Sequence, residues 1–124
     1  MSGRMTAMIV DDEPLLREIL KEEFESAGFM VIEADGGRAA FASLQKQPVD
    51  VVVSDIRMPG GSGLDLLDAI VGLGSGHPPV FLVTGYADVD RLVVLARGAT
   101  EVFEKPYSVR DLLEAVARRL TKAA

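Results

Sequence analysis

Short apolar runs alternate with amphipathic stretches along the whole chain. The first run, Ala7 to Val10, stops at an acid, which is typical of a strand buried on both faces of a parallel sheet. After it, Leu16, Leu20 and Phe24 recur at helical spacing, with Ile19 beside them. The predicted strands are Ala7 to Val10, Met30 to Ala34, Val49 to Ser54, Val80 to Val83, and a short one at Val102 and Phe103. The predicted helices are Pro14 to about Gly28, Arg38 to Gln45, Leu64 to Val71, Val89 to Ala96, and Ser108 to Leu120.

Five strands that alternate with five helices predict an α/β fold. The sheet is expected to be parallel, five-stranded and doubly wound, with right-handed crossovers that cover both faces. A flavodoxin-like strand order, 2-1-3-4-5, would make the first and third strands neighbours. The 124 residues suit a single domain, residues 1–124, with a core from about residue 6 to residue 121.

The composition narrows the class of protein. With 48% hydrophobic and 26% charged residues the chain is typical of a soluble globular domain, and its net charge of -6 disfavours direct contact with nucleic acid. It contains no cysteine, which excludes disulfides and thiolate metal sites. No apolar run suits a signal peptide or a membrane helix. We therefore expect a cytoplasmic protein that does not insert into membranes.

The predicted strands end in residues that can carry chemistry. Asp11 and Asp12 follow the first strand, Asp55 the third, Thr84 the fourth and Lys105 the fifth. Ligands of open parallel sheets bind beyond these carboxyl ends, so the three aspartates are expected to crowd one pocket. Clustered carboxylates take up protons or hold a cation, and oxygen-only ligands favour a hard ion such as Mg²⁺. One acid after a strand would be an ordinary helix cap, but this combination suits phosphoryl transfer to aspartate.

An ordered set of motifs resembles the receiver domain of response regulators, the CheY-like superfamily of two-component signalling. The set comprises Asp11-Asp12, Ser54-Asp55-Ile56-Arg57-Met58-Pro59, Gly63, Val83-Thr84-Gly85, Gly98-Ala99 and Lys105-Pro106. It extends over roughly Met8 to Leu120. Each piece alone is weak evidence, whereas the ordered set is specific.

The resemblance implies a magnesium site built from four residues. Asp12 and Asp55 are expected to ligate Mg²⁺ directly, together with the backbone carbonyl of Arg57. Asp11 is expected to act mostly through metal-bound water.

The resemblance also implies the roles of three catalytic residues. Asp55 is the phosphoryl acceptor, Thr84 turns its hydroxyl toward the phosphoryl group, and Lys105 pairs with that group. Arg57 and Tyr86 are expected to overhang the site and to hinder the water that hydrolyses the acyl phosphate. The Lys105-Pro106 peptide bond is expected to be cis.

The implied function is a phosphorylation-dependent switch. The domain would take a phosphoryl group from the phosphohistidine of a sensor histidine kinase or a phosphotransfer protein and signal through a changed protein-binding surface. It would catalyse its own phosphorylation and its own slow hydrolysis, so the word enzyme applies only loosely.

Two features depart from the family pattern. The family usually has an aromatic residue three positions before the lysine, where this chain has Val102. The neighbouring Phe103 is expected to point to the other face of the strand. The segment from Thr84 to Lys105 is one residue shorter than usual. These features affect the usual coupling of the threonine to an aromatic side chain and leave phosphate acceptance intact.

The fourth predicted helix is apolar almost all round, from Val89 through Leu92 to Ala96. A helix on a sheet needs only an apolar stripe, so the surplus predicts either a partner site or a helix tucked deeply against the sheet. Val102 and Tyr107 are expected to extend the same patch. We favour the partner site, a homodimer or output-protein contact over the fourth helix, fifth strand and fifth helix.

Three other functions are open to an α/β chain of this size. A flavodoxin-like FMN-binding module shares the architecture, but the acids after the first strand would repel the FMN phosphate. A haloacid-dehalogenase-like phosphatase needs Asp-x-Asp-x-Thr/Val after that strand, and the pattern is absent. A phosphate-independent pseudo-receiver scaffold is supported only by Val102.

Overall fold

Five parallel strands form one sheet in the order β2-β1-β3-β4-β5 in the computed structural model of the protein, which describes residues 4–85 and 90–122. The strands are β1 (Thr6–Val10), β2 (Met30–Ala34), β3 (Val51–Asp55), β4 (Val80–Thr84) and β5 (Glu101–Glu104). The helices are α1 (Pro14–Ser26), α2 (Gly37–Lys46), α3 (Gly63–Val71), α4 (Arg91–Ala96) and α5 (Val109–Lys122). The predicted fold class and strand order are confirmed. The predicted start of the fourth helix, Val89, lies outside the described residues.

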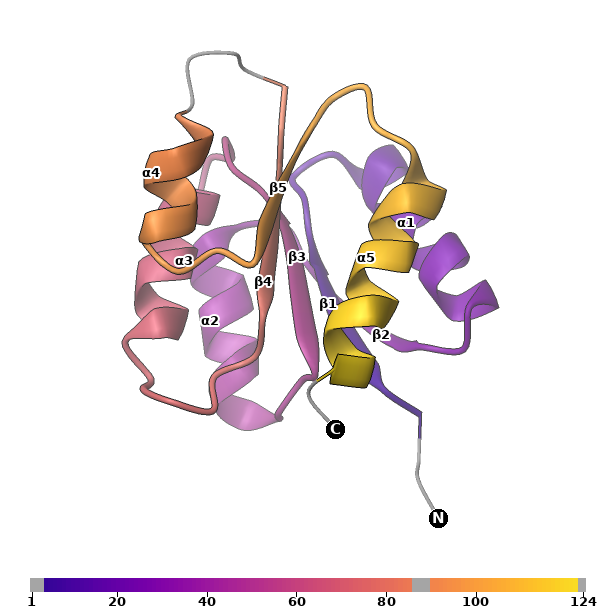
Figure 1. The fold of residues 1–124 in the computed structure, drawn as a ribbon, viewed down its shortest axis with the longest axis horizontal. Coiled ribbons are helices and arrows are strands. Elements are labelled where there is room, and N and C mark those ends of the chain that lie inside the picture. Colours follow the sequence, from indigo (N-terminus) through magenta and orange to yellow (C-terminus); the bar gives the residue numbers. More distant parts are fainter. Residues whose placement is uncertain (1–3, 86–89, 123–124) are drawn as a thin grey trace.

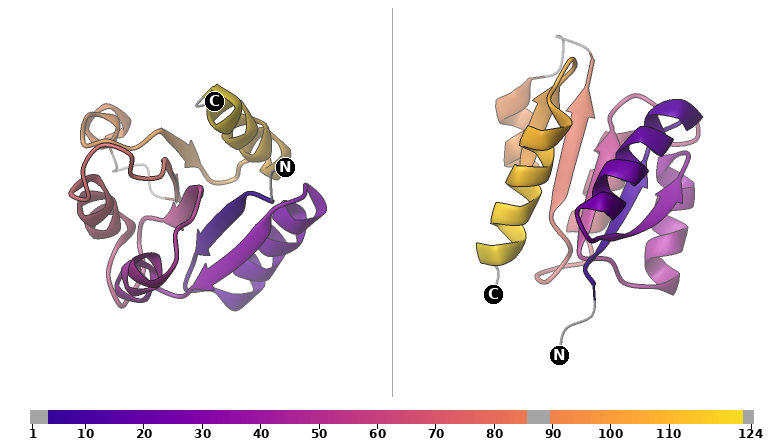
Figure 2. Two further views of the ribbon diagram at one scale, coloured as in Figure 1. Left: turned by 90° about the horizontal axis from the view of Figure 1, so that it is seen from below. Right: turned by 90° about the vertical axis from the view of Figure 1, so that its right-hand side faces the viewer.

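The helices cover the sheet on both faces. Figures 1 and 2 show α1 and α5 on one face, and α2, α3 and α4 on the other. Alternate residues of β1 point to opposite faces of the sheet. Met8 and Val10 pack on the α2–α3–α4 side, whereas Ala7 and Ile9 pack on the α1–α5 side. Because both faces are covered, the three central strands β1, β3 and β4 need continuous apolar runs, which is the pattern seen in the sequence.

The strand register brings the ends of β1, β3 and β4 to one edge of the sheet. Val10 pairs with Ser54, and Asp55 pairs with Val83. Asp11 therefore follows β1 at the level where Asp55 ends β3. Figure 1 shows this edge at the top of the molecule, away from the labelled chain ends.

Local signals in the sequence fix several helix starts. Pro14 is the first residue of α1, where its missing N–H costs no hydrogen bond. Ser62 accepts a hydrogen bond from the Asp65 N–H at 3.1 Å at the start of α3, and Ser108 accepts one from the Asp111 N–H at 3.2 Å at the start of α5. Ser62 and Ser108 therefore cap the starts of these two helices.

The predicted apolar stripe of α1 is only partly buried. Leu20 and Phe24 lie in the core, whereas Leu16 and Ile19 are 38% and 50% exposed. Helical spacing places these four residues on one face of α1, but α5 and the sheet cover only part of that face. In the part of the chain that the structure describes, no helix is both long and apolar enough to cross a membrane.

Two predictions about the apolar patch around α4 are wrong. Val102 does not extend a surface patch, because it is only 2% exposed and packs in the core between the sheet and the α2–α3–α4 layer. Tyr107 packs with the α1–α5 layer, beside Phe103. Phe103 does face away from Val102, as strand alternation predicts.

Candidate functional site

Three carboxylates meet at the carboxyl ends of β1 and β3. Asp11, Asp12 and Asp55 each offer one oxygen to a group whose members all lie within 4.8 Å of one another. Asp11 is only 4% exposed and Asp55 only 9%. Like charges this close repel each other unless a cation or a proton intervenes. The structure thus brings together the three acids that the sequence predicted would share a pocket.

Asp55 is held in place by its backbone neighbours and by a lysine. The Ile56 N–H donates to Asp55 Oδ1 at 2.8 Å, and Lys105 Nζ donates to Asp55 Oδ2 at 3.1 Å. The Ser54 hydroxyl donates to the Asp55 backbone oxygen at 2.8 Å. Each oxygen of an ionised carboxylate accepts more than one hydrogen bond or ligand, so both remain able to bind a further group.

The charges at the site shift two pKa values. Burial raises the pKa of Asp11, the Glu13 N–H that donates to its Oδ1 lowers it, and the charge of Asp55 raises it further, with a net rise. Burial lowers the pKa of Lys105, but the hydrogen bond and the charge of Asp55 outweigh this and raise it overall. Lys105 therefore remains a cation, and one lysine faces three acids.

This donor set fits a hard divalent cation. The acid cluster offers only carboxylate oxygens, and Mg²⁺ binds through one or two carboxylates while it keeps several waters. Asp12 and Asp55 are the residues that would hold the ion, with Asp11 beside them. Arg57, whose backbone carbonyl is the expected third ligand, lies in the loop after β3 with its side chain exposed.

Thr84 and Lys105 reach the same edge from the next two strands. Thr84 ends β4, one residue beyond the partner of Asp55, and is 1% exposed. The Lys105 N–H donates to the Thr84 carbonyl oxygen at 2.7 Å. The Lys105-Pro106 peptide bond is cis, as expected. Tyr86, the other residue expected to overhang the site, lies outside the described residues.

Gly63 allows α3 to begin directly against the phosphoacceptor candidate. The Gly63 N–H donates to the Ile56 carbonyl oxygen at 2.7 Å. A Cβ at Gly63 would overlap the backbone oxygen of Asp55 and would lie 3.0 Å from Ile56 Cα. Only glycine fits this close approach of two backbone segments.

Arg17 contacts the site although the sequence did not single it out. Its Nη1 donates to the Asp11 backbone oxygen at 2.7 Å, and its Nε donates to Glu33 Oε1 at 3.0 Å. Long side chains on a helix lean toward its N-terminus. The sequence signal for this contact is the position of Arg17, a basic residue in the first turn of the helix that follows Asp11.

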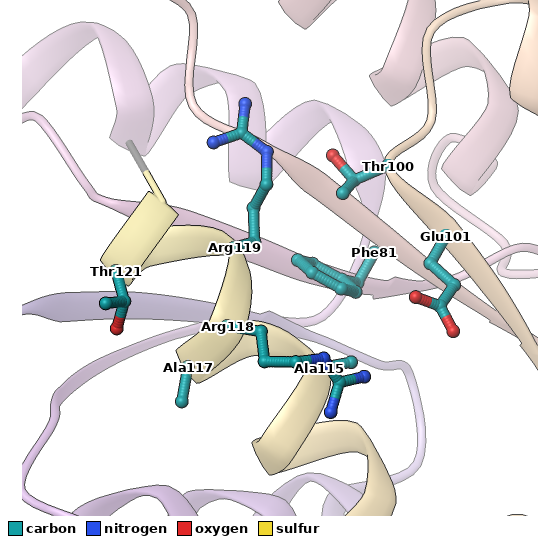
Figure 3. A pocket seen from close by; sticks show the side chains of 8 residues that line it. All are labelled: Phe81, Thr100, Glu101, Ala115, Ala117, Arg118, Arg119 and Thr121. Atoms are coloured by element: carbon teal, nitrogen blue, oxygen red, sulfur yellow. The ribbon is translucent and has the colours of Figure 1, made fainter. Parts of the chain in front are cut away.

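Two hollows lie at opposite ends of the sheet. One, of about 270 Å³, adjoins the acid cluster and is lined by Asp11, Leu16, Ile19, Leu20, Lys105, Pro106, Tyr107 and Val109. The other, of about 760 Å³, lies at the amino ends of β4 and β5 beside the last turns of α5. Figure 3 shows the residues that line this second hollow, with Phe81 and Thr100 on the sheet side and Arg119 on α5. The second hollow is remote from the acids, so it is not part of the site.

The sequence model of the response regulator receiver domain family matches residues 7–117. The chain belongs to this family. Among its relatives, the probable transcriptional regulatory protein TcrX of Mycobacterium tuberculosis is 34% identical over 118 residues, which cover 93% of this chain and 50% of TcrX. The C4-dicarboxylate transport transcriptional regulatory protein DctD of Pseudomonas aeruginosa is 39% identical over 114 residues, 91% of this chain and 24% of DctD. The receiver domain thus spans half or less of these relatives.

Solved receiver structures agree with this assignment. A CheY-like receiver domain protein from Methanospirillum hungatei is 29% identical, with a TM-score of 0.89 over 97% of this chain and 96% of that one. A receiver protein from Pseudomonas putida is 30% identical, with a TM-score of 0.86 over 95% of this chain and 99% of that one. Receiver domains generally depend on Mg²⁺ and pair with histidine kinases, and this one has the acidic cluster that a magnesium site needs.

Proposed function

We propose that this receiver domain is a phosphorylation-dependent switch that accepts a phosphoryl group on Asp55. The donor is the phosphohistidine of a sensor histidine kinase or a phosphotransfer protein, and the reaction depends on Mg²⁺. The observation that carries the proposal is the surroundings of Asp55. Its carboxylate lies within 4.8 Å of two other acids and also accepts a hydrogen bond from Lys105 at 3.1 Å. A carboxylate nucleophile between a metal site and a fixed cation suits in-line phosphoryl transfer.

Each protein group has a definable part in the transfer. An oxygen of Asp55 attacks the phosphorus as the bond between the donor imidazole nitrogen and the phosphorus breaks, and the imidazole leaves. The Ile56 N–H orients the carboxylate through Oδ1. Lys105, which starts on Asp55 Oδ2, moves to the phosphoryl oxygens, and the Thr84 hydroxyl donates to the same group. Asp12 and Asp55 would hold Mg²⁺, which when bound would neutralise negative charge on the phosphoryl group.

Acetyl phosphate provides the test, because it needs no cognate kinase. With Mg²⁺, the intact mass of the wild type should rise by one phosphoryl group, and Asp55→Asn should not react. EDTA should suppress the reaction in the wild type. A protein that keeps its mass under all these conditions would instead support a phosphate-independent scaffold, and modification in the presence of EDTA would contradict the metal site.

The surface beside the hollow near Asp11 suits the phosphodonor. Leu15, Leu16 and Ile19 are 80%, 38% and 50% exposed on α1, next to the carboxyl edge of the sheet. Contiguous exposed apolar area usually marks a protein contact. A donor domain on this face would bring its histidine within reach of Asp55. Leu15→Glu should slow transfer from a phosphorylated protein donor and leave the reaction with acetyl phosphate unchanged.

Output is proposed to pass through the α4–β5–α5 face, to a second copy or an output protein. Leu92 and Val93 of α4 are 75% and 52% exposed, so part of the apolar surplus predicted for this helix does reach the surface. Val94 is only 3% exposed, and a glutamate there would test folding, not binding. Leu92→Glu is the better probe: it should lower the association measured by analytical ultracentrifugation with beryllofluoride, a phosphate mimic, and unchanged association would exclude this face.

A further inference from the structure

Arg17 joins the loop that carries Asp11 and Asp12 to strand β2. Its Nη1 donates to the Asp11 carbonyl oxygen at 2.7 Å, while its Nε donates to Glu33 Oε1 at 3.0 Å. Lys21 Nζ lies 3.4 Å from the other Glu33 oxygen. The Arg17 side chain is only 19% exposed, low for an arginine on a surface helix. The guanidinium therefore forms a two-sided bridge between the acid loop and a strand of the sheet.

The bridge completes a set of hydrogen bonds around Asp11. The Asp11 N–H donates to the Ala34 carbonyl oxygen at 3.1 Å, and Asp11 Oδ1 accepts from the Glu13 N–H at 2.9 Å. With Arg17 on the carbonyl oxygen, the backbone N–H, the backbone C=O and the side chain of Asp11 are all engaged. The bond to Ala34 connects the loop to β2 directly, and the Arg17 bond connects it to the same strand through Glu33, so the position of the loop depends on that strand.

We propose that Arg17 is a positioning residue for the metal site: it fixes the turn at Asp11 and Asp12 so that their carboxylates are in place before the cation binds. The proposal rests on the function proposed above. Mg²⁺ demands near-ideal octahedral geometry, so a loop that must first be ordered binds it more weakly. Groups that orient metal ligands from behind contribute strongly to affinity in other metal sites.

The geometry of the bridge, and not its charge, carries the effect. The Asp11 partner of Arg17 is a neutral carbonyl group, and Glu33 is shared by Arg17 and Lys21. Loss of a positive charge beside the acids would by itself favour cation binding, so weaker binding would report the geometry. The planar guanidinium of Arg17 donates from two nitrogens to Glu33 and to the Asp11 carbonyl oxygen at once. The ammonium group of a lysine, on a flexible side chain, does not reproduce this geometry. Arg17→Lys should therefore behave like Arg17→Met, although it keeps the charge.

The first measurement is the dissociation constant for Mg²⁺ alone, from a titration followed by NMR of the ¹⁵N-labelled protein. In Arg17→Met and Arg17→Lys the Kd should rise about tenfold or more. The matched control is Lys21→Met, which also loses a contact to Glu33 but does not touch Asp11; its Kd should match the wild type. An unchanged Kd in Arg17→Met, or full recovery in Arg17→Lys, would overturn the proposal.

The second measurement needs no metal. In metal-free protein, hydrogen exchange at the Glu13 amide, which donates to Asp11 Oδ1, should be faster in both Arg17 variants than in the wild type. The Ile56 amide, which donates to the Val83 carbonyl oxygen of β4 and to Asp55 Oδ1, should keep its protection. Faster exchange at Glu13 with unchanged Mg²⁺ affinity would overturn the positioning role alone. A wild type that binds no Mg²⁺ would overturn the proposed function and this proposal with it.

Discussion

Gly63→Ala tests whether the backbone around Asp55 is as tightly packed as the structure indicates. The new Cβ would overlap the Asp55 carbonyl oxygen and would lie 3.0 Å from both the Asp55 carbonyl carbon and Ile56 Cα, inside the 3.4 Å at which ordinary contact begins. All three are backbone atoms, so no side chain can rotate away. The start of α3 must retreat instead, which stretches the 2.7 Å hydrogen bond from the Gly63 N–H to the Ile56 oxygen.

The expected loss of stability follows from the overlap of the new Cβ and from the stretched hydrogen bond. Overpacking a tight site costs about 1–3 kcal/mol. Loss of the buried hydrogen bond adds about 0.5–1.5 kcal/mol. The better helix propensity of alanine recovers at most about 1 kcal/mol. The middle of these ranges predicts that Gly63→Ala lowers the free energy of unfolding by about 2–3 kcal/mol. The variant should also slow phosphorylation of the folded fraction, because the backbone of Asp55 has to move.

Urea denaturation followed by circular dichroism measures the first effect, and intact mass after timed exposure to acetyl phosphate measures the second. Gly85→Ala is the matched control at the same edge of the sheet. Its Cβ would meet only the Lys105 side chain, at 3.6 Å and beyond, so its unfolding free energy should change little. If Gly63→Ala were as stable as Gly85→Ala and reacted at the wild-type rate, the close packing inferred at Asp55 would be wrong.

Three further predictions concern the charges and the access of water at the site. Asp12→Ala should remove most of the rise in melting temperature that saturating Mg²⁺ gives the wild type, and should stabilise the metal-free fold by relief of like-charge repulsion; a full Mg²⁺ response would contradict the ligand assignment. Burial and nearby carboxylates raise the pKa of Tyr107 from 10.0 to about 12, so its contribution to stability is present below pH 10.0 and is lost as the pH rises toward 12. An ultraviolet titration of Tyr86→Phe, which leaves Tyr107 as the remaining tyrosine, should show that raised midpoint, and a midpoint at 10.0 would contradict the burial. Arg57→Ala should change the rate of dephosphorylation by more than it changes the unfolding free energy. An unaltered rate of dephosphorylation would show that Arg57 does not hinder the water that hydrolyses the acyl phosphate.

The sequence predicted the sheet and the acid cluster because both depend on local patterns. A continuous apolar run ending in Asp55 is what a strand buried on two faces requires. Once β1 and β3 are neighbours, the acids that follow them must meet. The opposite orientations of Val102 and Phe103 likewise follow from strand alternation alone.

The wrong predictions concern coverage by distant segments. Helical spacing placed Leu16 and Ile19 on the stripe with Leu20, but no pattern within α1 tells how far its neighbours extend over that stripe. The position of Val102 in the last strand predicts an edge surface, yet α4 packs on that side of β5 and covers it. Tyr107 follows a proline turn, whose direction depends on the tertiary structure. The bridge of Arg17 to Asp11 and Glu33 depends on contacts across three segments, so spacing alone did not reveal it.

Peptide mapping of the phosphorylated protein tests the central claim most directly. After exposure to acetyl phosphate and Mg²⁺, borohydride reduction converts an acyl phosphate on aspartate into homoserine, which marks the modified position for tandem mass spectrometry. The account predicts homoserine at Asp55 and unmodified aspartate at Asp11 and Asp12. A label at Asp11 or Asp12, or a label that persists elsewhere in Asp55→Asn, would contradict it.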